Sequence, residues 1–322
     1  ILLTPIILFV ILMVLLYIPP VQNLLRREVT AYASKATGMQ IQVERIDLRF
    51  PLNLLVRGVE VIQQPDTLLS LESLNVRVQA WPLLKGKVEV DEVTLSQVAV
   101  NSANLIEGMQ IKGVLGRFFL QSHGVDLSNE TAVVNRTELS DTHIQLLMTD
   151  TTTTPKDTTA SAPVNWKVNL HQLKLKNVSF GMKLPADSMK MAAYIGEATI
   201  DDAKADLKNQ FYGLKQFLLS GASASYDTGE AQPSEGFDAS HMAVRNIRIG
   251  LDSLLYEGRN MNAVIREITM EERSGLSITS LTGRLFSNDS IIRIPELKLQ
   301  TPHSEIDLSA DRKSTRLNSS HY

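Results

Sequence analysis

The sequence contains no cysteine, few aromatic residues and no excess of basic charge. Without cysteine the chain can form no disulfide, no thiolate metal site and no cysteine nucleophile. Aromatic residues make up 6% and the formal net charge is −3. A nucleic-acid-binding protein normally shows a basic stripe or an aromatic stacking platform. We therefore expect no nucleic-acid partner.

Motifs of catalysis and cofactor binding are also missing. The chain has no P-loop, no GxGxxG, no GxSxG and no HExxH, and its six histidines are scattered without paired ligand spacing. The acidic pairs Asp201-Asp202 and Glu271-Glu272 would point to opposite faces of a strand, so neither forms a general acid and base pair. We expect no enzyme activity, no catalytic residue, no cofactor and no metal.

The amino-terminal segment is an uninterrupted apolar run. Residues 1–18 carry no charge and as a helix would extend about 27 Å, close to the ~30 Å hydrocarbon core of a bilayer. Tyr17 suits the membrane interface, and Pro19-Pro20 suits the end of the helix. A cleaved signal peptide needs a small-residue site directly after the run, whereas the Ala-x-Ala at residues 31–33 lies beyond charged residues. We predict a transmembrane signal anchor at residues 1–19, with its orientation left open.

A short amphipathic helix is predicted at residues 20–38. Apolar residues recur at helical spacing from Val21 to Ala36, Pro20 suits the first turn, and Gly38 suits the stop. This helix is expected to lie on a membrane surface or to plug one end of the structure that follows.

After Gly38 the hydrophobic period changes from about 3.6 to 2, which is typical of β-strands. One pattern, apolar-x-apolar-x-x-apolar-x-apolar, recurs through the chain. Its copies are Ile41, Val43, Ile46, Leu48; Val93, Leu95, Val98, Val100; Leu173, Leu175, Val178, Phe180; Met242, Val244, Ile247, Ile249; and Ile292, Ile294, Leu297, Leu299. A step of three moves apolar residues to the other face unless a β-bulge restores the phase and bends the strand. The repeat therefore predicts a bent sheet with one apolar side, although tight turns between short strands of a sandwich remain an alternative.

The predicted fold class is mainly β: a transmembrane helix and a short amphipathic helix, followed by an elongated, curved, mostly antiparallel β-sheet groove. Residues 39–148 are the first part of the groove, 149–163 a disordered Thr/Pro insertion, 164–310 its continuation, and 311–322 a non-native tail. Which strand face turns inward stays open. The candidate groove-lining residues are Val88, Val90, Val93, Leu95, Val98, Val100, Leu173 and Leu175.

Residues 17–25, 37–61 and 65–100 carry a resemblance to a known family. The most specific part is the DTLL segment followed by a strand, then the WPLL-KGK turn and a strand that contains VTL. This order resembles the amino-terminal region of TamB-type translocation and assembly module proteins, in the AsmA-like family. The resemblance implies a single anchor in the cell inner membrane, a body in the periplasm, and an outer-membrane barrel assembly partner.

The function expected from the pattern and the resemblance is phospholipid transport between membranes and outer-membrane biogenesis. An apolar floor would hold phospholipid acyl chains, each methylene contributing about 0.8 kcal/mol on burial. The alternative is a chaperone for outer-membrane β-barrel proteins that pairs through an edge strand. A weaker alternative is a structural or adhesive envelope protein.

Overall fold

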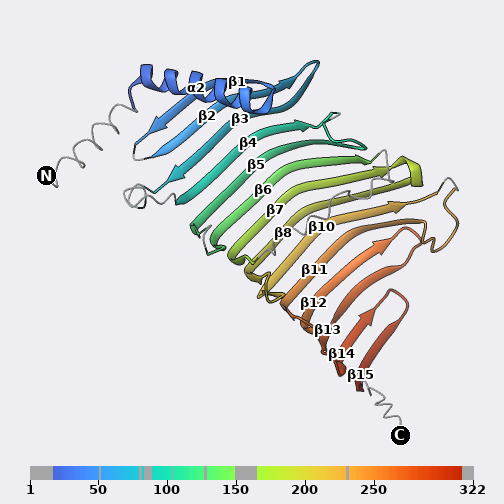
Figure 1. The fold of residues 1–322 in the computed structure, drawn as a ribbon. Helices are drawn as coiled ribbons and strands as arrows, with labels where there is room; N and C mark the ends of the chain where they lie inside the picture. The colour runs from blue at the N-terminus through green and yellow to red at the C-terminus, as the bar shows by residue number, and fades with distance from the viewer. Residues whose placement is uncertain are drawn as a thin grey trace, which may run out of the picture.

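The protein is a single long β-sheet with one α-helix at its amino-terminal end (Figure 1). The computed structural model describes residues 17–50, 52–79, 82, 89–103, 105–126, 129–148, 165–229 and 232–313. Strand residues make up 73% of the described residues, in one 15-stranded sheet. The mainly β, mostly antiparallel fold expected from the period-2 pattern is confirmed.

The elements follow one another in sequence order. They are α2 (Pro19–Thr37), β1 (Gln40–Arg49), β2 (Asn53–Gln63), β3 (Asp66–Val78), β4 (Val90–Asn101), β5 (Met109–Asp126), β6 (Thr131–Met148), β7 (Lys167–Leu184), a 3-10 turn (Pro185–Asp187), β8 (Met189–Asp206), β9 (Phe211–Leu214), β10 (Gln216–Asp227), β11 (His241–Glu257), β12 (Asn260–Glu272), β13 (Ser277–Ser287), β14 (Ile291–Gln300) and β15 (Glu305–Lys313).

The strands form a meander in which each strand pairs with its neighbours in the sequence. The pairs are antiparallel except for β6 and β7, which are parallel. Strands β9 and β10 both lie between β8 and β11, and they act as two halves of one strand interrupted at Lys215. Consecutive pairing of this kind produces a long ribbon of strands, as the even progression of colour in Figure 1 shows.

Helix α2 begins and ends where the sequence predicts. Proline occupies its first turn, and Gly38 closes it in the left-handed conformation with φ 70°, donating its backbone N–H to the carbonyl of Ser34 at 3.0 Å. The amphipathic helix expected at residues 20–38 is thereby confirmed to within one residue. In the part of the chain that the structure describes, no helix is long and apolar enough to cross a membrane. Residues 1–16 of the predicted anchor lie outside the described residues.

The sheet is a single layer. Each strand makes its substantial contacts only with the strands beside it, and α2 makes them only with β1. Among the described residues, no large side chain is fully buried. A sandwich would pack one sheet against another, so the sandwich alternative is wrong for this part of the chain.

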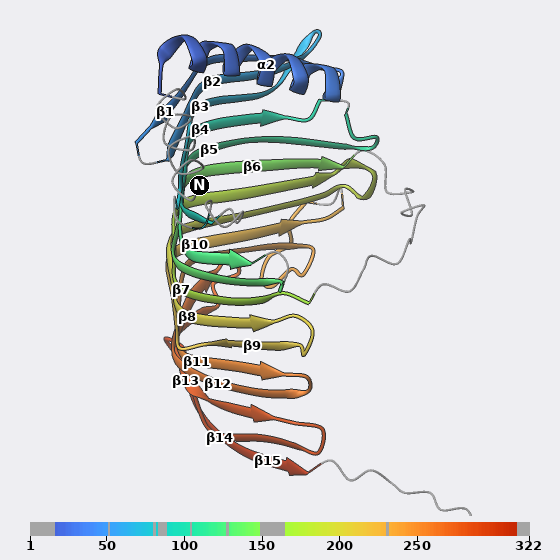
Figure 2. The ribbon, with the colours of Figure 1, turned by 60° about the vertical axis from the view of Figure 1, so that its left-hand side comes forward.

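A line of unpaired positions, which we call the first crease, crosses strands β1 to β8. At the crease, one residue on each of two neighbouring strands has no pairing partner. The register is therefore the same before and after the crease. The skipped residues are Glu44, Gly58, Glu72, Gln97, Gly116, Asp141, Asn177 and Gly196. Gly58, Gln97, Asp141 and Asn177 take left-handed backbone conformations there, with φ between 49° and 59°. Figure 2 shows the strands bending away from a common spine.

The crease corrects the predicted mechanism of the phase jump. We expected a β-bulge at each joint, with two residues opposite one. At the joints of β1, β4 and β7 no register shift occurs, because the neighbouring strand makes the same jump at the same level. Bulges with a register shift do occur at the joints of β11 and β14. The phase jump is therefore shared across strands in the first half of the sheet.

Glycine is required where the crease brings two strands close together. A Cβ atom on Gly116 would lie 2.7 Å from the Cβ of Asp141, and one on Gly196 would lie 2.9 Å from the carbonyl oxygen of Gly221. Neither distance is possible without movement of the backbone. Glycine on one strand therefore allows a larger residue to occupy the crease on the next strand.

A second crease crosses β6, β7 and β8 at Asn135, His171 and Asp202, where the flanking residues pair and these do not. Asp202 again has a positive φ, of 50°. In β7 the second crease separates Leu170 from Leu173 by a step of three, which the sequence analysis did not use. The two creases divide these strands into a central segment and two flanking segments.

The remaining expectations about segments have different outcomes. Residues 228–229 and 232–240, between β10 and β11, belong to no helix or strand. The predicted insertion at 149–163 lies outside the described residues. Strand β15 extends to Lys313, three residues into the segment assigned to a non-native tail, and Asp311 there lies 3.1 Å from Nε of Arg293.

Candidate functional site

The central segments of the strands carry a continuous row of apolar side chains across the whole sheet. Each member of this row, which we call row one, is the pairing partner of the next. Row one consists of Ile46, Val56, Leu74, Leu95, Phe118, Leu139, Leu175, Ala198, Leu219, Ile249, Ile268, Leu281, Leu299 and Ile306. At ~4.8 Å between strands, it extends over about 60 Å.

A second row runs beside the first, two residues away on each strand except β12, where a register shift separates Ile268 from Ile265 by three. Row two consists of Leu48, Leu54, Val76, Val93, Leu120, Thr137, Leu173, Ile200, Phe217, Leu251, Ile265, Gly283, Leu297 and Leu308. Only Thr137 and Gly283 interrupt its apolar character. Because residues two apart on a strand share a face, rows one and two form one apolar face.

The side chains of this face are mostly half-buried rather than enclosed. In row one, Ala198 is buried, with 4% of its surface exposed, and Ile306 is 52% exposed. All other members of row one are half-buried. Their neighbours on the same strands cover them only from the sides. Within the described residues no second layer covers the apolar face.

The structure places most of the predicted groove-lining residues on this apolar face. Leu95 and Leu175 belong to row one, and Val93 and Leu173 to row two. Val98 continues the face beyond the first crease, where it pairs with Leu71 and Leu115. Val100 is one strand period further on and is 37% exposed.

Two predicted residues fall elsewhere. Val90 pairs with Val78 after a register shift, at the edge of the rows, and its carbonyl accepts a hydrogen bond from the hydroxyl of Ser122. Val88 lies outside the described residues. The sequence analysis missed most members of the rows, including Phe118, Leu219 and Ile268, because the rows emerge only once the strands are in register.

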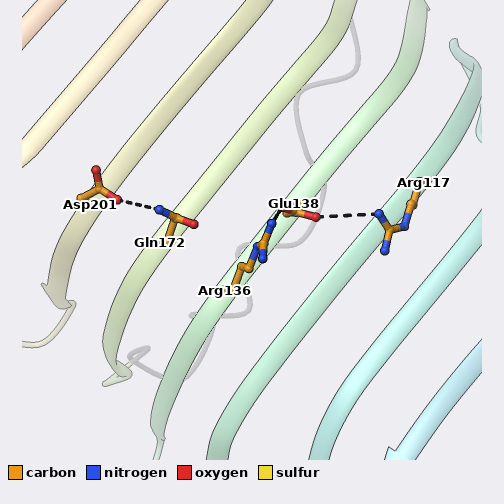
Figure 3. Close-up of polar contacts among 5 residues, drawn as sticks. All are labelled: Arg117, Arg136, Glu138, Gln172 and Asp201. Carbon is orange, nitrogen blue, oxygen red and sulfur yellow. Dashed lines mark hydrogen bonds and ion pairs between the residues drawn. The ribbon is translucent and has the colours of Figure 1, made fainter.

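The opposite face of the central segments is mostly polar, and its apolar exceptions between the rows are Leu55, Phe119 and Leu218. Figure 3 shows Glu138 of β6 between Arg117 of β5 and Arg136, with Arg117 Nη1 3.8 Å from Glu138 Oε2 and Arg136 Nε donating to Glu138 Oε1 at 2.8 Å. On the next strands Gln172 Nε2 donates to Asp201 Oδ1 at 3.1 Å. The residues at these positions alternate with rows one and two. The single layer thus has one face suited to water and one suited to hydrocarbon.

Two hollows in the surface lie away from the apolar rows. The larger, with a volume of about 1000 Å³, is lined by residues at the ends of β6, β7 and β8, among them His143, Ser179 and Gly181. The other lies at the second crease beside His171 and Asp202. No member of row one or row two lines either hollow.

The titratable groups are held in local polar contacts. Lys215 donates to Asp202 at 2.7 Å, and His171 lies 3.1 Å from the same carboxylate, so both lower the pKa of Asp202. Backbone N–H groups of Ser234 and Ser240 lower the pKa of Asp238 further below its usual range. Among the described residues no cluster of three or more potential metal ligands occurs.

Buried His241 completes this second cluster, with Nδ1 3.0 Å from Oδ2 of Asp238. The contact fixes the end of the 228–240 loop against the start of β11. The bonds from the backbone N–H groups of Ser234 and Ser240 to Asp238 are those of a turn.

Comparison with protein-family models finds no match, and comparison with curated proteins finds no similar sequence.

Proposed function

We propose that this protein is a membrane-anchored lipid conduit, in which the curved sheet forms an elongated groove and its apolar face carries phospholipid acyl chains. The observation that supports the proposal most is the pair of apolar rows. The two rows run across the sheet from β1 to β15, and no layer among the described residues covers them.

The physical reason is the free energy of hydrocarbon in water. Moving an acyl chain from water to an apolar surface contributes about 0.8 kcal/mol for each methylene that is buried. Successive strands offer equivalent contacts, so a chain that leaves one pair of side chains meets the same environment on the next. Repeated weak contacts of this kind allow a lipid to move along the sheet, whereas a single deep pocket would retain it.

The creases contribute to the proposed groove. They bend each strand between its central and flanking segments, and the apolar positions continue beyond the first crease, as with Val98 in β4 and Val178 in β7. Flanking segments that bear the same apolar face would shield the sides of an acyl chain as well as its underside. The headgroup would remain in water at the open side.

The resemblance to the TamB-type, AsmA-like family supports the location that we propose. The anchor would lie in the cell inner membrane, the sheet in the periplasm, and the partner would be an outer-membrane barrel assembly protein. In that setting the conduit would serve phospholipid transport between the membranes and outer-membrane biogenesis. We propose no catalytic role.

Edge-strand chaperoning is the alternative. It requires an open edge, and α2 covers the outer edge of β1 through side chains that bond to that strand's backbone. This edge is therefore not free to receive another strand. The chaperone hypothesis would have to depend on a different edge.

Photo-crosslinking with a benzophenone amino acid tests the proposal. We would place the probe at Leu173 and Leu175 on the apolar face, and at Lys174 as the matched control, because Lys174 pairs with Glu138 on the polar face. In native membranes we expect lipid adducts at the two leucines and none at Lys174. Protein adducts at the leucines, or no adducts at any position, would contradict a lipid conduit.

A further inference from the structure

Helix α2 turns its polar side to the sheet. Gln22, Arg26, Thr30 and Ser34 are spaced four residues apart and so lie along one side of the helix. Gln22 Nε2 donates to the carbonyl of Leu48 at 3.0 Å, Arg26 Nη1 donates to the carbonyl of Val43 at 3.0 Å, and the N–H of Ile41 donates to Ser34 Oγ at 3.0 Å. These backbone groups belong to the edge of β1 that pairs with no strand. The helix therefore closes an edge that would otherwise be open to another chain.

The apolar side of α2 is left uncovered. Leu25, Val29 and Tyr32 follow one another at helical spacing, and their exposed fractions are 38%, 52% and 78%. Leu25 is one position before Arg26, about 100° around the helix, so this stripe lies to one side of the polar residues that contact β1. A helix on a globular protein normally buries its apolar stripe and exposes its polar side. Here the arrangement is reversed.

The chain around α2 indicates what covers the stripe. Residues 1–16, directly before the helix, contain no charged residue. The helix itself carries Arg26, Arg27 and Lys35 against a single acid, Glu28. An amphipathic helix with an excess of basic residues suits a lipid surface that bears anionic headgroups. A tyrosine in the stripe suits the boundary between headgroups and acyl chains.

We propose that α2 lies in the surface of a lipid bilayer through Leu25, Val29 and Tyr32. Its polar side, with Gln22, Arg26 and Ser34, holds the edge of β1. Membrane contact and edge closure are then two sides of one helix. This arrangement places the first strand of the sheet, and the start of both apolar rows, beside the bilayer. The inference depends on the membrane attachment in the proposed function but not on lipid transport.

The absence of cysteine makes the test direct, because each labelled variant carries a single thiol. We would prepare Leu25→Cys, Val29→Cys and Tyr32→Cys, with Asn23→Cys, Arg27→Cys and Ala31→Cys as controls on other sides of α2. Each full-length variant is labelled with an environment-sensitive fluorophore and reconstituted in vesicles of phosphatidylcholine and phosphatidylglycerol. Quenching is then measured with spin-labelled lipid and, separately, with aqueous iodide.

We expect lipid quenching to be several-fold stronger at the three stripe positions than at the three controls, and iodide quenching to show the opposite order. Equal quenching of both sets would overturn the inference. Stripe labels shielded from both quenchers would also overturn it, because protein rather than lipid would then cover the stripe. Lipid crosslinking at Leu175 is independent of these results, so the conduit and the helix contact can fail separately.

Discussion

Asn177 donates a hydrogen bond from its side-chain Nδ2 to Oδ1 of Asp141 over a distance of 2.7 Å. The two residues lie on β7 and β6, the parallel pair of the sheet, and both have left-handed backbone conformations, with φ 53° and 51°. Asn and Asp tolerate this conformation better than other residues with side chains. The pair therefore holds the first crease where the two strands run in the same direction.

Replacing Asn177 tests whether the crease depends on its backbone conformation. We expect Asn177→Val to lower the free energy of unfolding by about 2 kcal/mol, because a β-branched residue is strained at positive φ and the hydrogen bond is lost. Asn177→Gly loses the hydrogen bond but relieves the strain, so its effect is expected to stay below about 1 kcal/mol. Urea unfolding of both variants measures the difference. Equal destabilisation would show that conformation does not matter at this position.

The close approach of strands at the crease gives a second prediction, for glycines in the same sheet. In Gly196→Ala the new Cβ would lie 2.9 Å from the carbonyl oxygen of Gly221, so the backbone must shift, at a cost of about 1–3 kcal/mol. The matched control is Gly181→Ala, whose Cβ would meet its nearest atom only at 3.9 Å. Thermal or urea unfolding should show a loss for Gly196→Ala and a change within about 0.5 kcal/mol for Gly181→Ala. The reverse order would mean that the crease can relax.

The sequence alone was sufficient to predict the strands and one of their bends. The step of three in Leu175-Val178 and in Leu95-Val98 marks the first crease, and the polar joint residues identify where it lies. The step from Leu170 to Leu173 marks the second crease by the same signal. A repeat defined by four apolar positions was too short to show two bends in one strand.

Register is the part that the sequence could not supply. Whether neighbouring strands jump at one level or bulge past one another depends on which residues face each other, and pairing is a property of two segments. The strand character of residues 203–206 also depends on pairing. It follows from the pairing of Ala203 with Leu170 and of Ala205 with Val168.

The low pKa of Asp238 predicts how the 228–240 loop responds to acid. A carboxylate whose pKa is lowered in the folded state contributes stability above its unfolded pKa of about 3.9, and this contribution is lost as the pH falls through the folded value. Because backbone N–H groups of Ser234 and Ser240 hold the charged form, the loop should remain ordered below the pH at which ordinary carboxylates protonate. Amide exchange at Ser240, followed by NMR from pH 6 downward, measures this range.

The matched comparison for this prediction is Asp238→Asn. It keeps the shape of the side chain but removes the charge, so the protection of Ser240 from exchange, relative to the intrinsic rate at each pH, should be lower than in the parent at neutral pH and should not change with acid. Unchanged exchange in the variant would show that the carboxylate does not order the loop.

The last prediction concerns movement along the apolar rows, which the crosslinking of a bound lipid does not address. The double variant Leu173→Asp/Leu175→Asp places two charges side by side across rows one and two on β7, where an acyl chain would have to pass. A charge is strongly disfavoured next to hydrocarbon, so we expect lipid to accumulate on one side of β7. Probes at Leu95 and Ile249, on opposite sides of the substituted strand, should then give unequal yields of lipid adduct.

Leu173→Ala/Leu175→Ala is the control, because it removes a similar volume of side chain without adding charge, and its yields at the two probes should remain as in the parent. Urea unfolding of both double variants separates a barrier from a loss of the fold. If the aspartate variant is folded and the yields at Leu95 and Ile249 fall together or stay equal, lipids bind the sheet at independent places. In a conduit, the rows are the path that joins the two probes. Charges on β7 should therefore reduce the amount of lipid that reaches the probe on one side of that strand and not the amount at the other.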